Sequence, residues 1–291
     1  MRFTNHALSV AAGLALIFSA GFYSAQAQSF LGGMLKSIEK EVENPAAGSG
    51  SNFGGTSNDL FEAAKNSRLG PMGRFFLGRK LSAHVLGKTD AIPVGHPISQ
   101  YVRNVALTIL GSSNYAGSYS DPIVIVLKDK KTINAFAAPG NFVFITTGML
   151  NFLRNEDELA FVLAHEIAHI ELDHGLNAIK SKQGADLFKG AVGNGVMDGL
   201  DGLFNFMENG FSAELEGEAD RRGAELAAKS GYDPSAGKSV IKRLENKQGR
   251  KHATGYPEDR QANIELVIRN SKPIAQSSVK SRASRYKLFV K

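Results

Sequence analysis

The sequence contains no cysteine among its 291 residues. This absence excludes disulfide bonds, thiolate metal sites, a cysteine nucleophile and a lipid-modified N-terminal cysteine. A transition metal would therefore have to be bound by histidine, aspartate and glutamate side chains. A strong excess of one charge is also missing, because 34 basic residues against 28 acidic residues give a net charge of +6. We therefore expect no nucleic-acid partner.

Long hydrophobic runs are missing as well, except at the start of the chain. Residues 1–27 have the pattern of a secretory signal: Arg2, then the uncharged apolar run Ala7–Tyr23, then the cleavage sequence Ala25-Gln-Ala27. The alternative is a retained membrane anchor, for which the run is short and diluted by glycine and serine. We expect cleavage before Gln28 and a periplasmic or secreted mature protein.

The mature chain divides into segments of different composition. Residues 28–58 combine an amphipathic helix with a flexible linker, residues 59–272 form the main domain, and residues 273–291 are a basic C-terminal tail that we expect to be solvated. Residues 184–210 are apolar and interrupted by glycines. They fit a flap over a cleft, a peripheral membrane contact or a pair of packed helices.

The strongest motif lies on the clearest helix of the sequence. Asn155 can cap this helix, and an apolar stretch follows that contains His165-Glu166-Ile-Ala-His169. Residues four apart share a helical face, with Cβ atoms about 5–6 Å apart. Two imidazoles at this spacing can bind one tetrahedral zinc ion, and the adjacent glutamate can take a proton from a water molecule held by the zinc. The motif therefore predicts His165 and His169 as metal ligands and Glu166 as general base.

A catalytic zinc site also needs a third protein ligand. His174 lies five residues after His169, and we expect it to end the same helix and to interact with the helix dipole rather than the metal. A second helix carries Glu214, Glu216, Glu218 and Asp220. Periodicity alone does not separate the glutamates, but one carboxylate can bind zinc while another accepts a hydrogen bond from a ligand imidazole.

Several ordered segments together resemble one family. They are Ile133–Gly140, Asn141–Gly148, Glu158–His169, Glu216–Asp220, Gly231–Pro234 and Pro257–Arg260. In these segments the sequence resembles zinc metallopeptidases of the HtpX and CaaX-prenyl-protease type, and most closely their soluble periplasmic branch typified by BepA and LoiP.

The resemblance implies an α+β, zincin-like fold that is mostly helical, with a small antiparallel sheet beside the metal-binding helix. It selects Glu216 as the third ligand of one Zn²⁺ per chain and Asp220 as the residue that orients a ligand histidine. Members of this branch often carry a late histidine where this sequence has Thr254, with His252 two residues earlier. Arg260 or His252 is then expected to stabilise the developing oxyanion.

The resemblance also implies a polypeptide substrate bound in extended form. We expect the strand at residues 141–145 to be an edge that pairs with the substrate backbone. The expected substrate-binding residues are Asn134, Ala135, Phe136, Phe142, Val143 and Phe144. The predicted function is a metalloendopeptidase that cleaves unfolded or misassembled envelope proteins for quality control. The alternative is a chaperone-like client-binding protein with a latent or self-inhibited zinc site.

Overall fold

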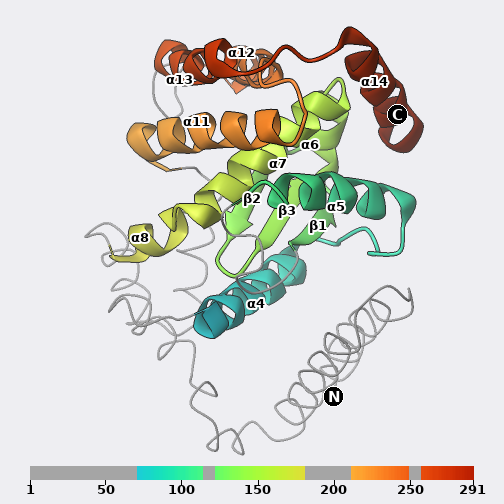
Figure 1. Cartoon of the computed structure of the whole chain (residues 1–291). Helices are drawn as coiled ribbons and strands as arrows, with labels where there is room; N and C mark the ends of the chain where they lie inside the picture. Colours follow the sequence, from blue (N-terminus) through green and yellow to red (C-terminus); the bar gives the residue numbers. More distant parts are fainter. Residues whose placement is uncertain (1–70, 114–121, 181–210, 249–256) are drawn as a thin grey trace, which may run out of the picture.

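The computed structural model describes residues 71–113, 122–180, 211–248 and 257–291 (Figure 1). They form a three-stranded sheet covered by helices on both faces, which confirms the predicted α+β class. The expected signal sequence, the 28–58 segment, the 184–210 segment and His252 lie outside the described residues. Within the described ranges, no helix is both long and apolar enough to cross a membrane.

The sheet is mixed rather than wholly antiparallel. Its order is β1 (Ile123–Leu127), β3 (Phe142–Thr146), β2 (Ala135–Ala138). The tight turn after β2 makes β2 and β3 an antiparallel hairpin, with Phe136 opposite Phe144. β1 lies at the far side of β3 and runs parallel to it. The expectation of an antiparallel sheet is wrong for β1, because β1 pairs with the strand that is not its neighbour in sequence.

The strand order also corrects the expected substrate edge. β3 is the central strand, so both of its edges are already paired, and Phe142, Val143 and Phe144 are at most 5% exposed. Phe136, Phe142 and Phe144 pack against α4 (Pro71–Lys88) because alternate residues of a strand point to one face. These residues build the core under α4 and do not line a cleft.

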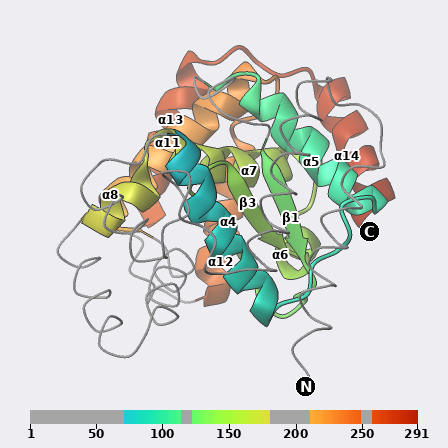
Figure 2. The same cartoon turned by 90° about the horizontal axis from the view of Figure 1, so that it is seen from below.

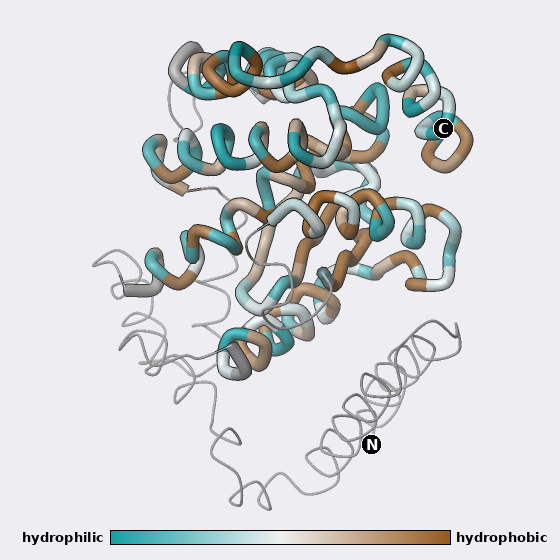
Figure 3. Tube along the Cα trace, in the orientation of Figure 1, coloured by the Kyte–Doolittle hydropathy of each residue, from teal (hydrophilic) through white to brown (hydrophobic). Residues whose placement is uncertain are grey.

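The opposite face of the sheet carries α5 (Pro97–Leu110) and α7 (Glu156–Glu171). Figure 3 shows that the strands and the adjoining part of α5 are the most hydrophobic part of the molecule. The short helix α6 (Thr147–Phe152) connects β3 to α7, and Asn155 caps α7 by accepting a hydrogen bond from the Glu158 amide at 2.9 Å. α7 is buried almost throughout, as predicted.

Three further helices cover the other side of α7 (Figure 1). α11 (Ala213–Lys229) packs along α7, α13 (Pro257–Asn270) packs on α11, and α12 (Ala236–Gln248) packs against both α13 and α7. The close approach of α11 depends on Gly223, where a Cβ atom would lie 2.9 Å from the backbone nitrogen and Cα of His165. After α7, a short turn leads into α8 (His174–Lys180).

The basic C-terminal segment is not a solvated tail. It forms α14 (Gln276–Val290), which packs beside α5 and the start of α7 (Figure 2). Tyr286 is fully buried, and Arg285 and Arg282 form ion pairs with Glu156 and Asp157 in the first turn of α7. The expectation fails because these acidic groups are buried and need counter-charges, which α14 supplies. The bounds of the predicted domains stay a prediction.

Candidate metal centre

His165 and His169 point from α7 toward Glu216 of α11. The Nε2 atoms of the two histidines are 3.0 Å apart, and the Glu216 carboxylate oxygens lie 3.5 Å from His165 Nε2 and 3.8 Å from His169 Nε2. All three side chains are largely buried, and their donor atoms lie within 4.8 Å of one another. Ligands about 2.0–2.2 Å from a tetrahedral zinc ion lie about 3.3 Å apart, so this group fits zinc.

The first turn of α11 holds Glu216 in place. Ser212 caps this helix, and the backbone N–H of Phe211 donates to Glu216 Oε1 at 3.0 Å. Burial alone would raise the pKa of Glu216, but His165 and Arg260 outweigh burial and hold this pKa below its ordinary value. Glu216 is therefore an ionised carboxylate at neutral pH, as a metal ligand must be.

Asp220 lies behind His165, as predicted. Its Oδ1 atom is 3.0 Å from His165 Nδ1, and its side chain is completely buried. Arg260 of α13 binds both carboxylate oxygens of Asp220 and places Nη2 3.2 Å from Glu216 Oε2. The structure thus brings Arg260 to the site, where its guanidinium group is engaged by two carboxylates. Its role toward an oxyanion stays a prediction, as does that of His252.

The pKa values of the two ligand histidines are shifted in opposite directions. Burial alone would lower the pKa of His165, but Asp220 and Glu216 outweigh burial and raise this pKa to about 10. Burial lowers the pKa of His169, which is therefore a neutral imidazole. Two carboxylates facing His165 make the centre attractive to a cation.

Glu166 is buried beside the two histidines, with 7% of its surface exposed. Burial raises the pKa of its carboxyl group to about 7. A group whose pKa lies near the working pH is well suited to accept a proton and return it. Glu166 thus lies beside the two histidines, and its role as general base stays a prediction.

His174 and Phe211 were not predicted as parts of the centre. His174 begins α8 instead of ending α7, because Asp173 adopts a left-handed backbone conformation with φ 57° and turns the chain. Its Nδ1 atom lies 2.9 Å from Nδ1 of His169. The Phe211 ring stacks on His169 with ring centroids 4.3 Å apart. The signal in the sequence was Asp173 before His174, since aspartate tolerates this conformation better than most residues do.

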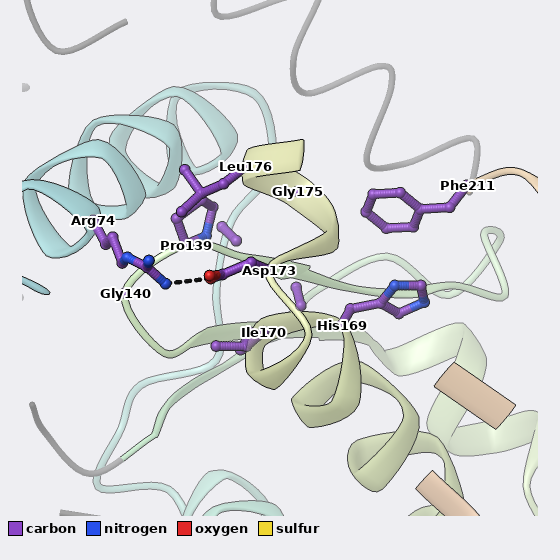
Figure 4. A pocket seen from close by; sticks show the side chains of 11 residues that line it. Arg74, Pro139, Gly140, His169, Ile170, Asp173, Gly175, Leu176 and Phe211 are labelled. Carbon is purple, nitrogen blue, oxygen red and sulfur yellow. Dashed lines mark hydrogen bonds and ion pairs between the residues drawn. The ribbon is translucent and has the colours of Figure 1, made fainter. Parts of the chain in front are cut away.

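A small, partly open cavity lies beside His169 (Figure 4). Its wall combines the end of β2, the turn at Pro139 and Gly140, and the start of α8. Arg74 of α4 and Asp173 form an ion pair at this cavity. Ala137 and Ala138 of β2 line this cavity together with His169, so the cavity joins the metal centre to β2.

The chain is similar in sequence to known proteins. The model of Peptidase family M48 matches residues 99–256. The beta-barrel assembly-enhancing protease of Yersinia pestis is 30% identical over 161 residues, covering 50% of this chain and 32% of that protein. The mitochondrial metalloendopeptidase OMA1 of Schizosaccharomyces pombe is 32% identical over 165 residues, covering 54% of this chain and 47% of that protein. The chain thus spans about a third to nearly a half of these relatives' length.

Proposed function

Because the chain belongs to peptidase family M48, we propose that it is a zinc-dependent metalloendopeptidase in which His165, His169 and Glu216 hold the metal. The observation that carries this proposal is the convergence of three buried donor atoms from α7 and α11, with Glu166 beside them. When bound, a zinc ion there would polarise a substrate carbonyl and lower the pKa of a water molecule to about 7.

Residues of the chain carry out proton transfer and hold the metal ligands in place. Glu166 accepts a proton from the attacking water at its carboxylate and passes it to the leaving amine. Asp220 fixes the ring of His165 through Nδ1, and Arg260 pairs with both Asp220 and Glu216. The burial of Glu166 and Glu216 keeps both groups in surroundings where charges interact strongly.

In the described part of the chain β2 pairs with β3 on one side only, and its other side replaces β3 as the proposed substrate edge. The Thr146 N–H donates to the Asn134 carbonyl, so Asn134 and Thr146 form a hydrogen-bonded pair of the ladder. Hydrogen-bonded pairs recur at every second residue, so on β2 the next ones are at Phe136 and Ala138. The intervening Ala135 and Ala137 therefore direct their backbone N–H and C=O groups away from β3. These groups support pairing with an extended polypeptide, and Ala137 also lines the cavity beside His169.

We further propose that the protein works in the periplasm or outside the cell on unfolded or misassembled envelope proteins. The support is the signal-like sequence at residues 1–27 and the similarity to proteins named beta-barrel assembly-enhancing protease. Peripheral membrane contact through residues 184–210 is part of the same proposal. The alternative is a client-holding protein with a latent zinc site.

Metal content and casein cleavage test the proposal together. The wild-type protein is expected to hold one zinc ion per chain and to cleave casein, and Glu166→Gln is expected to hold zinc and to lose cleavage. Full activity of Glu166→Gln would overturn the assignment of the base. Zinc in both proteins with cleavage by neither would favour the client-holding alternative.

A further inference from the structure

We propose that His174 and Glu218 form a relay that positions His169 and strengthens its hold on the metal. This inference rests on the proposed zinc site, because it assigns a role to residues behind one of the ligands. His174 begins α8 and Glu218 lies on α11, so the relay joins three elements through side chains alone.

The contacts form one continuous line. Nδ1 of His169 lies 2.9 Å from Nδ1 of His174, and Nε2 of His174 lies 3.2 Å from Oε2 of Glu218. His174 is 1% exposed, whereas the Glu218 side chain is 46% exposed. The line therefore begins at a buried metal ligand and ends at a carboxylate that water reaches.

The chemistry of the rings fixes the direction of both hydrogen bonds. Nε2 of His169 faces His165 and Glu216, so this nitrogen must be unprotonated to bind a metal. Nδ1 of the neutral His169 ring then carries the proton and donates to Nδ1 of His174. A neutral His174 that accepts at Nδ1 carries its proton on Nε2, and this group donates to Glu218. Every nitrogen in the line has one role.

Packing against Phe211 restrains the orientation of the two imidazole rings. The Phe211 ring stacks on His169, and it lies 5.9 Å from the His174 ring between centroids. Rotation of His169 would break this stacked contact as well as a hydrogen bond, and rotation of His174 would break its hydrogen bonds to His169 and Glu218. A carboxylate that polarises a ligand histidine increases the basicity of the ligand nitrogen. Here that effect passes through His174.

The other ligand histidine has a different arrangement. His165 faces Asp220 directly, and Asp220 is fully buried and bound by Arg260. Glu216, Glu218 and Asp220 thus stand at alternate positions of one helix and serve as ligand, relay end and direct partner. The two ligand histidines are thus positioned by different groups. Substitution of the groups behind one histidine is therefore expected to affect zinc binding separately from substitution of the groups behind the other.

Zinc affinity of the full chain tests the relay without using activity. We would measure it by competition with a chromogenic chelator for the wild type, His174→Phe, His174→Asn and Glu218→Ala. Glu214→Ala is the matched control, because Glu214 is an exposed acid of the same helix. His174→Phe is expected to weaken zinc binding about 10–100-fold, and Glu218→Ala to weaken it less. His174→Asn is expected to recover most of the affinity, because its amide oxygen can accept the His169 proton.

Each result decides between the proposals. A wild-type chain that binds no zinc would overturn the proposed function itself. If the wild type binds zinc, either of two results would overturn the relay alone. One is that His174→Phe has the same zinc affinity as the wild type, and the other is that His174→Asn binds zinc as weakly as His174→Phe. Circular dichroism of the zinc-free variants checks folding. If zinc-free His174→Phe is unfolded, Glu218→Ala decides: a loss absent from Glu214→Ala supports the relay, and unchanged affinity overturns it.

Discussion

Arg260 binds Asp220 with two parallel hydrogen bonds, Nε to Oδ2 at 2.6 Å and Nη2 to Oδ1 at 2.9 Å. Because Asp220 is completely buried, its charge has to be balanced inside the protein. The same guanidinium group lies 3.2 Å from Glu216. One arginine therefore contacts both the proposed ligand Glu216 and the carboxylate that faces the ligand His165. Arg260 is therefore a structural counter-charge of the centre.

Removal of Arg260 is expected to destabilise the fold. Arg260→Met leaves Asp220 buried without its partner, which costs about 3–5 kcal/mol of unfolding free energy. Urea denaturation of the zinc-free chain measures this loss, and Arg260→Met combined with Asp220→Asn should recover part of it. Unchanged stability together with lost cleavage would instead favour the role of Arg260 at the oxyanion.

Gly223 is expected to control the spacing between α11 and α7. The added methyl group of Gly223→Ala would meet the backbone of His165 at 2.9 Å, so the helices must separate and Glu216 must move from the histidines. Overpacking of this kind costs about 1–3 kcal/mol, and weaker zinc binding should accompany the lower melting temperature. Gly217→Ala in the same helix meets only the side-chain amide of Asn263, which can turn aside. Equal effects of both substitutions would contradict the prediction.

Ala137→Pro tests the proposed substrate edge. Proline removes an N–H that points away from β3, so the sheet should stay folded while one hydrogen bond to the substrate is lost. A bond worth about 1 kcal/mol predicts a KM higher by about fivefold in peptide cleavage. Ala137→Ser keeps the N–H and should leave KM near the wild-type value. An unchanged KM in the proline variant would argue against strand pairing at β2.

Alkaline pH is expected to unfold the protein through its buried tyrosines. Burial raises the pKa of Tyr232 to about 12, and it also raises the pKa values of Tyr101 and Tyr286. Raised pKa values of tyrosines stabilise the fold below about pH 10, where unfolded tyrosine is still neutral, and this stabilisation is lost as the pH rises toward 12. Tyr232→Phe should shift unfolding to higher pH.

Tyrosinate absorbance measures this directly, because the chain has seven tyrosines and no tryptophan. We expect part of the absorbance change to appear only together with unfolding, as followed by circular dichroism. Titration of all tyrosines near pH 10 with the fold intact would refute the prediction.

The local part of the site was predictable from sequence because it depends on helical spacing. His165, Glu166 and His169 share one helix, and the geometry of that helix fixes how they converge. Asp220 follows Glu216 by one helical turn, so this pair was predictable as soon as Glu216 was selected. The fold class, like the choice of Glu216, followed from the resemblance to a family.

The features that the sequence did not predict depend on contacts between residues far apart in the chain. The central place of β3 results from the crossing of β1 to its far side, which no local pattern records. His174 joins the centre because a single residue, Asp173, turns the chain out of α7. The basic C-terminal segment looked solvated because its partners, Glu156 and Asp157, are far away in sequence.

The start of α7 also sets an order of events during synthesis. Its three consecutive acids pair with Arg285 and Arg282 of α14 and with Arg243 of α12, and Arg285 follows Glu156 by 129 residues. A growing chain that already contains the zinc-binding motif therefore still lacks the cations that let this helix be buried. Burial of the start of α7 has to wait until α14 has been synthesised.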